Sequence, residues 1–143
     1  MPPLPEPARV KQVAALPIRR EGSDVAILLV TTLDTGRWII PKGWPMPDRS
    51  DPEAAAQEAW EEAGVRGTVR TESIGAYTYG KRRKRGRVTL VRVDVYLLEV
   101  TDEQPTWPEQ MQRRRQWFTP AEAALRVLEP ELAIMLAAVG STI

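Results

Sequence analysis

The 143-residue chain contains no cysteine and no histidine. The absence of cysteine excludes disulfide bridges, thiolate zinc sites and cysteine nucleophiles. The absence of histidine excludes Ser-His-Asp catalysis, imidazole general bases and histidine-bound metals. Any acid–base or metal chemistry must therefore rest on Asp, Glu, Lys or Tyr.

The chain also lacks a long apolar run and a strong net charge. No segment reaches the roughly 20 apolar residues of a membrane-spanning helix, and the start, MPPLPEPARV, has no apolar stretch typical of a signal peptide. With 20 Lys and Arg against 19 Asp and Glu, the net charge is +1, which does not indicate nucleic-acid binding. We therefore expect a cytoplasmic protein without a membrane or nucleic-acid partner.

The length and the 43% hydrophobic content fit a single domain. We expect residues 1–8, which hold four prolines, to form a flexible arm in front of one domain at 9–143. Apolar and alternating segments predict strands at 10–18, 25–32, 37–40, 67–79, 87–100 and 115–118. Helices are expected at 51–64 and at 120–139, the second with a break at Pro130. This mixture of strands and helices indicates a layered α/β fold.

Three glutamates are spaced to lie on one face of the helix expected at 51–64. Glu58, Glu61 and Glu62 stand at positions i, i+3 and i+4, which brings them within about 60° of one another on a helix. Carboxylates this close repel one another, and a hard divalent cation converts the repulsion into ligation. The cluster therefore predicts metal-dependent chemistry on phosphates; a solvated acidic face is the alternative for a short glutamate run.

The helix that carries the glutamates has clear end signals and a packing face. Ser50 and Glu53 fit a capping box at its start, and Gly64 fits a C-terminal stop. The face expected to pack against the sheet consists of Ala56, Ala59, Trp60 and Ala63. Small residues permit a close approach of helix and sheet, which would hold a site rigidly.

Extended back to Gly43, the glutamate segment resembles the Nudix box of the Nudix hydrolases. That box reads Gly-x5-Glu-x7-Arg-Glu-aliphatic-x-Glu-Glu-x-Gly-aliphatic. The positions that match it are Gly43, Glu58, Glu61, Glu62, Gly64 and Val65. Two positions depart, because Arg49 replaces a Glu and Gln57 replaces an Arg. In the family, the Glu and the Arg at these positions commonly pair and connect the loop to the helix. We expect an altered contact between loop and helix in this chain.

The resemblance implies the family's α/β/α sandwich around a mixed β-sheet and hydrolysis of a pyrophosphate bond. It implies Glu58, Glu61 and Glu62 as the catalytic and metal-binding residues, with the backbone carbonyls of Lys42 and Gly43 completing the metal site. Mg²⁺ is the implied cofactor, and Mn²⁺ is an alternative. The resemblance also allows a homodimer.

A basic turn after the strand expected at 67–79 predicts contacts with a highly charged phosphate chain. Its cations are Lys81, Arg82, Arg83, Lys84, Arg85 and Arg87. Arg suits bidentate phosphate contacts and Lys suits point-charge attraction, whereas a solvated hairpin tip is the alternative. The expected substrate-binding residues are Trp38, Lys42, Gly43, Lys81, Arg82, Arg83 and Arg85.

Two segments point to a narrower group within the family. Residues 38–43 (WIIPKG) and 114–118 (RRQWF) resemble the diphosphoinositol polyphosphate phosphohydrolases, and the Pro-Lys-Gly step also resembles diadenosine polyphosphate hydrolases. A phosphorylated small molecule is therefore the implied substrate. A module that binds such a ligand without hydrolysing it is the alternative. A further carboxylate outside the box often completes such sites, and the sequence leaves Glu103 and Glu109 open as candidates.

Overall fold

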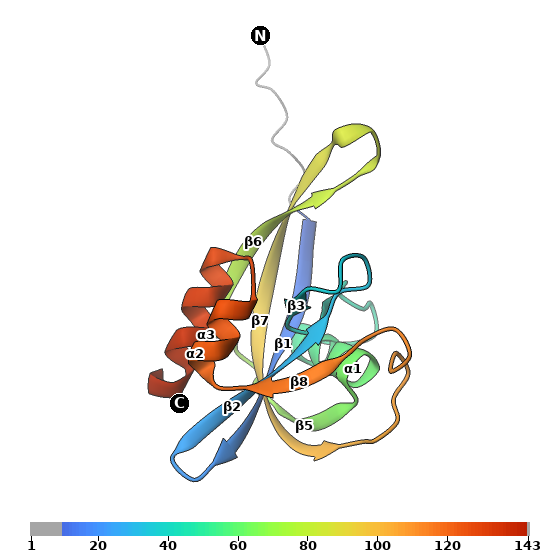
Figure 1. Cartoon of the computed structure of the whole chain (residues 1–143). Coiled ribbons are helices and arrows are strands. Elements are labelled where there is room, and N and C mark those ends of the chain that lie inside the picture. The colour runs from blue at the N-terminus through green and yellow to red at the C-terminus, as the bar shows by residue number, and fades with distance from the viewer. Residues whose placement is uncertain (1–9, 143) are drawn as a thin grey trace.

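The computed structural model describes residues 10–142, which are built around one mixed β-sheet (Figure 1). The strands are β1 (Val10–Glu21), β2 (Asp24–Thr31), β3 (Trp38–Ile39), β4 (Lys42–Gly43), β5 (Val65–Val69), β6 (Gly75–Arg82), β7 (Val88–Glu103) and β8 (Arg115–Phe118). The helices are α1 (Asp51–Ala63), α2 (Pro120–Arg126) and α3 (Pro130–Thr142), with a 3-10 turn at Lys84–Gly86. The arm expected at 1–8 lies outside the described residues.

The centre of the sheet is the parallel pair β1 and β7, in which Val10 lies beside Val91 and Ile18 beside Glu99. The other pairings are antiparallel: β2 and β4 on β1, β3 and β8 on β2, and β5 and β6 on β7. The two central strands are rich in Val, Leu and Ala because both faces of this part of the sheet are covered.

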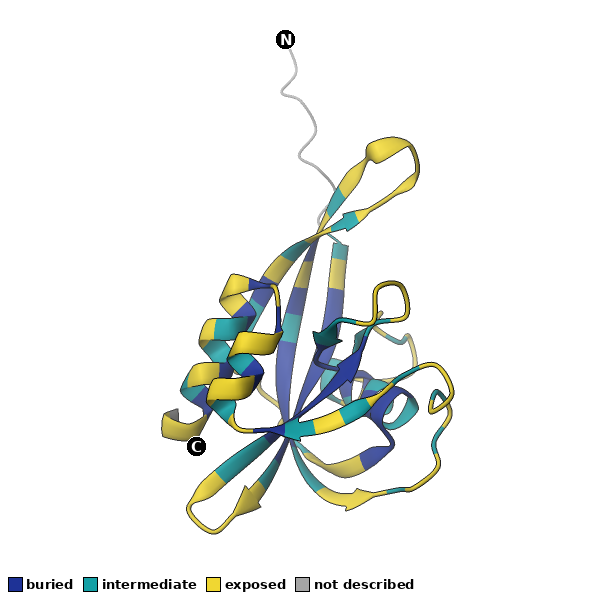
Figure 2. Ribbon diagram, in the orientation of Figure 1, coloured by how far each residue is buried: buried dark blue, intermediate teal, exposed yellow. Residues whose placement is uncertain are grey.

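Helices cover the two faces of the sheet (Figure 1). Helix α1 packs on β1 and β5, whereas α2 packs on β2 and β8, and α3 packs on β6 and β2. The strands between these layers hold most of the buried residues (Figure 2). The predicted α/β/α sandwich around a mixed sheet is confirmed, and it places the glutamate-bearing helix against the central strands.

Several predicted boundaries were wrong. The single strand expected at 67–79 is two strands, β5 and β6, because the polar segment 71–73 leaves the sheet between them. Both pair with β7, at opposite ends of that long strand. The two-residue strand β4 lies within the stretch expected to be a loop, and its pairing with β1 fixes Gly43 beside the sheet centre.

The break predicted at Pro130 is confirmed, since α2 ends at Arg126 and α3 begins at Pro130. Proline has no backbone N–H and is favoured at the first turn of a helix, so it starts α3 as a separate helix. No helix in the stretch 10–142 combines the length and the apolar character needed to cross a membrane.

Candidate functional site

Helix α1 is capped at both ends. The capping box predicted at its start is present, because Glu53 N donates to Ser50 Oγ (3.3 Å) and Ser50 N donates to Glu53 Oε1 (3.1 Å). Gly64 ends the helix in the left-handed conformation with φ 68°. The residues buried against the sheet include Ala54, Ala55, Ala59 and Ala63. Trp60 was expected on this face, but it is only partly buried and stacks with Arg66 at 4.0 Å.

Glu62 is buried on the same side of α1 as these alanines, and the edge of this side borders a cavity of about 680 Å³. Its acidic wall contains Glu58 and Glu62 from α1 and Glu109 from the loop at 104–114. Its basic residues are Arg37, Lys42, Lys81, Arg82 and Arg113. Acidic and basic side chains therefore face the same cavity. Such a site can bind a metal ion through the carboxylates and an anionic ligand through the basic groups.

Glu58 and Glu62 are neighbours at positions i and i+4 of α1, and each influences the pKa of the other. Burial raises the pKa of Glu62 to about 9, with Arg113 opposing the rise and Glu58 and Glu109 adding to it. Burial also raises the pKa of Glu58. Glu61 differs, because its carboxylate accepts a hydrogen bond from Gln57 Nε2 (3.0 Å) and is not part of the cavity wall. Of the three predicted glutamates, two meet at the cavity.

The residues fit a hard divalent cation. A Cβ atom on Gly43 would overlap the carboxyl group of Glu58, so only glycine lets the β4 backbone come this close to the carboxylates. Among residues 10–142, no three acidic side chains already converge as a cation cage. A cation at Glu58 and Glu62 would therefore need further oxygen donors, and the backbone carbonyls of the adjacent β4 are candidates.

The raised pKa of Glu62 gives a stability prediction for metal-free protein. Between the ordinary value near 4.5 and about 9, the folded state holds a proton that the unfolded chain has lost. Stability therefore falls as pH rises through this window. Thermal unfolding in EDTA should give a lower Tm at about pH 8.5 than at about pH 6, and Mg²⁺ should raise Tm more at the higher pH. A Tm in EDTA that stays level or rises would contradict this.

The structure separates the two candidate carboxylates outside the box. Glu109 faces the cavity, and Arg113 Nε donates to its Oε1 at 2.8 Å. Glu103 lies elsewhere, where it accepts from Trp117 Nε1 (3.2 Å) and pairs with Arg115 (3.5 Å). Glu109 is therefore the acidic group that joins Glu58 and Glu62.

The two departures from the box still make contact with each other. Arg49 Nη1 donates to Gln57 Oε1 (3.1 Å), and Gln57 Nε2 donates to Glu61 Oε1 (3.0 Å). A hydrogen-bonded chain thus runs from the glycine loop to Glu61. The altered pair connects loop and helix without a buried unpaired charge.

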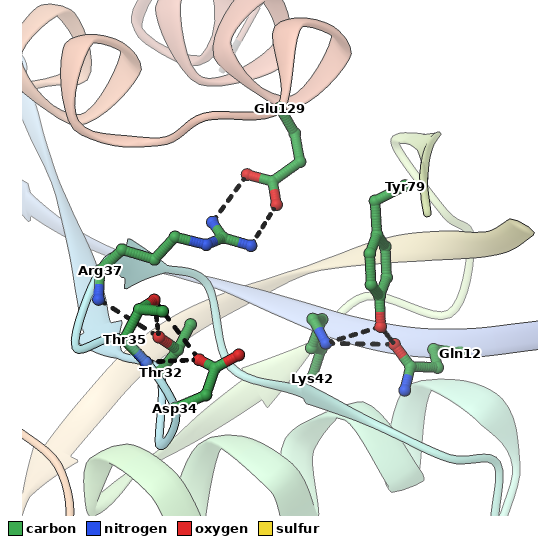
Figure 3. A network of polar contacts seen from close by, with 8 residues as sticks. All are labelled: Gln12, Thr32, Asp34, Thr35, Arg37, Lys42, Tyr79 and Glu129. Atoms are coloured by element: carbon green, nitrogen blue, oxygen red, sulfur yellow. Dashed lines mark hydrogen bonds and ion pairs between the residues drawn. The ribbon is translucent and has the colours of Figure 1, made fainter. Parts of the chain in front are cut away.

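One cationic part of the cavity is a partly buried polar network around Lys42 (Figure 3). Lys42 Nζ contacts Gln12 Oε1 (3.2 Å) and the Tyr79 hydroxyl (3.1 Å), and that hydroxyl donates to Gln12 Oε1 (2.7 Å). Gln12 is only 3% exposed. Near this network, Lys81 Nζ lies 4.9 Å from the ring centre of Trp44, which is 41% exposed.

The remaining predicted substrate-binding residues lie outside the cavity wall. Trp38 packs edge-on against Phe118, with ring centres 5.2 Å apart. Arg83 donates to Thr89 Oγ1 (3.3 Å) on the exposed hairpin, and Arg85 lies at the tip of that hairpin. The hairpin of β6 and β7 projects from the body of the molecule, so its tip is far more open than its base (Figures 1 and 2).

Arg37, Gln12 and Arg113 are cavity residues that the sequence reasoning missed. Arg37 forms a two-pronged ion pair with Glu129 (3.2 and 2.8 Å), which ties the loop at 32–37 to the start of α3 (Figure 3). Gln12 could have been noticed as a polar residue in an apolar strand. Arg113 belongs to a run of arginines that carries no signal of its own.

Comparison with known proteins gives consistent results. A family model described as NUDIX domain matches residues 8–139. Human diphosphoinositol polyphosphate phosphohydrolase 3-beta is 33% identical over 121 residues, which cover 83% of this chain and 69% of the human protein. Nudix hydrolase 16, mitochondrial, of Arabidopsis thaliana is 34% identical over 105 residues, which cover 71% of this chain and 58% of the plant protein.

Solved structures share the fold. The crystal structure of the C. elegans Ap4A hydrolase matches with a TM-score of 0.69 and 20% identity, covering 94% of this chain and 98% of the other. At this identity the likeness concerns the arrangement of strands and helices.

Proposed function

Because this chain belongs to the Nudix hydrolase family and is a pyrophosphohydrolase, we propose that it cleaves a polyphosphorylated small molecule with Mg²⁺ as its cofactor. The observation that carries the proposal is the cavity in which buried Glu62 and partly buried Glu58 are joined by Lys42, Lys81 and Arg82. Phosphate chains need cationic contacts, and a cation needs the carboxylates.

Glu58 and Glu62 would hold the cation, with the Gly43 carbonyl beside them and Glu61 supporting from the next position on the helix. When bound, Mg²⁺ neutralises phosphate oxygens and acidifies water for attack. Mn²⁺ suits the same oxygen donors. The raised pKa values of Glu58 and Glu62 support this assignment, because a cation removes the cost of burying two ionised carboxylates.

Glu109 is our proposed proton acceptor for the attacking water. It reaches the cavity from the opposite loop, and Arg113 holds its carboxylate through the 2.8 Å hydrogen bond. Carboxylates act as general bases when they lie within hydrogen-bond reach of the water that they deprotonate.

Lys42 is a proposed phosphate ligand with a fixed orientation. Gln12 and Tyr79 contact its ammonium group, which has three donor hydrogens, so one remains for a phosphate oxygen. Preorganised donors of this kind stabilise charge that develops on the leaving phosphate.

A diphosphoinositol polyphosphate is our first choice of substrate, because the human relative is named for that activity and matches most of this chain. A diadenosine polyphosphate is the second choice. The half-exposed indole of Trp44 at the cavity favours it, since a nucleobase stacks on an open aromatic face.

Chromatographic measurement of the products formed from a panel of substrates tests the proposal. The panel contains a diphosphoinositol polyphosphate, a diadenosine polyphosphate and ADP-ribose, each with Mg²⁺ and with EDTA. We expect Mg²⁺-dependent turnover of one of the first two compounds. Tight binding of both without any turnover would overturn hydrolysis and support the ligand-binding alternative, and preferred turnover of ADP-ribose would overturn the substrate class.

Removing the cations of the cavity wall should weaken substrate binding. Lys81→Ala with Arg82→Ala should raise KM by about 10-fold or more, because charge-assisted hydrogen bonds contribute about 1.5–3 kcal/mol each. Arg83→Ala with Arg85→Ala is the matched control, since it removes the same charge from the hairpin outside the cavity wall. Equal KM values for the two double variants would show that the cavity contacts do not bind substrate.

A further inference from the structure

We propose that Trp107 and Arg115 are positioning residues that set Glu109 against the glutamates of α1. Their side chains bind the C-terminal end of that helix rather than lining the cavity. The inference rests on the proposed role of Glu109 and names the side chains that would keep its carboxylate in position.

The C-terminal end of a helix leaves backbone carbonyls without partners inside the helix. In α1, donors from the chain segment at 104–115 occupy these carbonyls in succession. The pairs are Glu109 N to Glu61 O (3.0 Å), Trp107 Nε1 to Glu62 O (3.0 Å), Arg115 Nη1 to Ala63 O (2.8 Å) and Gln104 N to Gly64 O (2.9 Å). The position of this segment relative to the helix that carries the glutamates is therefore fixed by four hydrogen bonds to successive carbonyls.

Trp107 and Arg115 act together. The Arg115 guanidinium carbon lies 3.8 Å from the ring centre of Trp107, and both side chains rest on Gly64. A Cβ atom at Gly64 would come within 2.8 Å of Trp107 Cβ and of Arg115 Nη1. Glycine is thus needed here for its left-handed backbone and for the space under this stacked pair.

The stacked pair fixes the loop at the point where the Glu109 carboxylate leaves it. Glu109 follows Trp107 by two residues, and its own N–H bonds to the helix at Glu61 O. Arg113 holds the other end of the loop by donating to Thr31 O (2.9 Å) and to Glu109 Oε1 (2.8 Å). Loss of the indole donor should therefore let Glu109 move relative to Glu58 and Glu62.

Trp107→Phe tests this role because it keeps an aromatic ring for Arg115 and removes the N–H donor. Trp117→Phe is the matched control. It also removes an indole donor and a ring stacked by an arginine, but its direct partners are Glu103 and Arg19 rather than α1. Glu103 also pairs with Arg115, and the bond from Arg115 to Ala63 O does not involve Trp117. We expect Trp107→Phe to lower kcat by about 10-fold with little change in KM, and Trp117→Phe to leave kcat unchanged.

A double-mutant cycle separates positioning from general destabilisation. On a Glu109→Gln background, Trp107→Phe should cause no further fall in kcat, because both changes remove the same contribution. Additive losses would overturn the proposal, as would equal kcat losses in the Phe variants of Trp107 and Trp117.

Amide hydrogen exchange gives a readout that does not depend on activity. The Glu109 N–H should lose protection in Trp107→Phe and keep it in Trp117→Phe. Unchanged protection at Glu109 in Trp107→Phe would overturn the positioning role. An inactive wild type with this exchange pattern would instead overturn the proposed function and leave the structural role of the pair supported.

Discussion

Replacing Glu62 with glutamine is expected to lower kcat by about 10³-fold and to stabilise the metal-free protein at the same time. Glu62 is 4% exposed, and burial raises its pKa to about 9. Arg113 lies 3.8 Å from Glu62 and offsets only part of this rise, so at neutral pH the metal-free folded state holds a proton on Glu62. Glutamine has the same shape and cannot ionise, so folding improves while the proposed cation loses a ligand.

Two measurements check these effects: kcat for product formation with Mg²⁺, and Tm at about pH 8 in EDTA. Glu72→Gln is the control, because it makes the same chemical change at an exposed residue outside the cavity and should alter neither value. A Glu62→Gln variant with near-normal kcat, or with a lower Tm in EDTA, would contradict the assignment of Glu62 as a buried cation ligand.

Gly43→Ala should reduce kcat/KM by about 100-fold or more while leaving Tm almost unchanged. The added methyl group would meet the carboxyl end of Glu58, which is the flexible end of its side chain and can turn away. Turning away costs little stability, but it removes a carboxylate from the proposed cation site. Steady-state kinetics over a range of Mg²⁺ concentrations and a thermal melt measure the two quantities separately.

Gly140→Ala is the matched control for Gly43→Ala. Its Cβ atom would lie 3.7 Å from the Pro120 ring, which is an ordinary contact, and the residue is in α3, away from the cavity. We expect unchanged kinetics there, with a small gain in stability from the higher helix propensity of alanine. If Gly43→Ala lost stability and kept its activity, the close approach of β4 to Glu58 would serve folding rather than the reaction.

Local signals were enough to predict the helix that carries the site. The Ser50 capping box, the stop at Gly64 and the spacing of Glu58 and Glu62 all act within a few residues of one another. Each therefore appears in the structure where the sequence indicated it. The same holds for the break at Pro130, which depends on the missing N–H of one residue.

Features that depend on distant contacts could not be predicted. Glu103 and Glu109 belong to the same polar stretch, and only the path of the loop across the end of α1 brings Glu109 to the cavity. Trp60 was expected in the core, but the alanines of α1 already fill the space against the sheet, and Trp60 stacks outside on Arg66. Arg113 acquires its position from Thr31, far away along the chain.

The parallel pairing of β1 with β7 also determines when the site can form during synthesis. Val10 can pair with Val91 only after the chain has been synthesised past β7. The centre of the sheet therefore forms only after most of the chain has left the ribosome. Helix α1 emerges earlier, with its glutamates and no loop against its end. A nascent chain that has not yet produced Glu109 and Arg113 therefore carries the acidic helix without a finished cavity, and cation binding should accompany the last stage of folding.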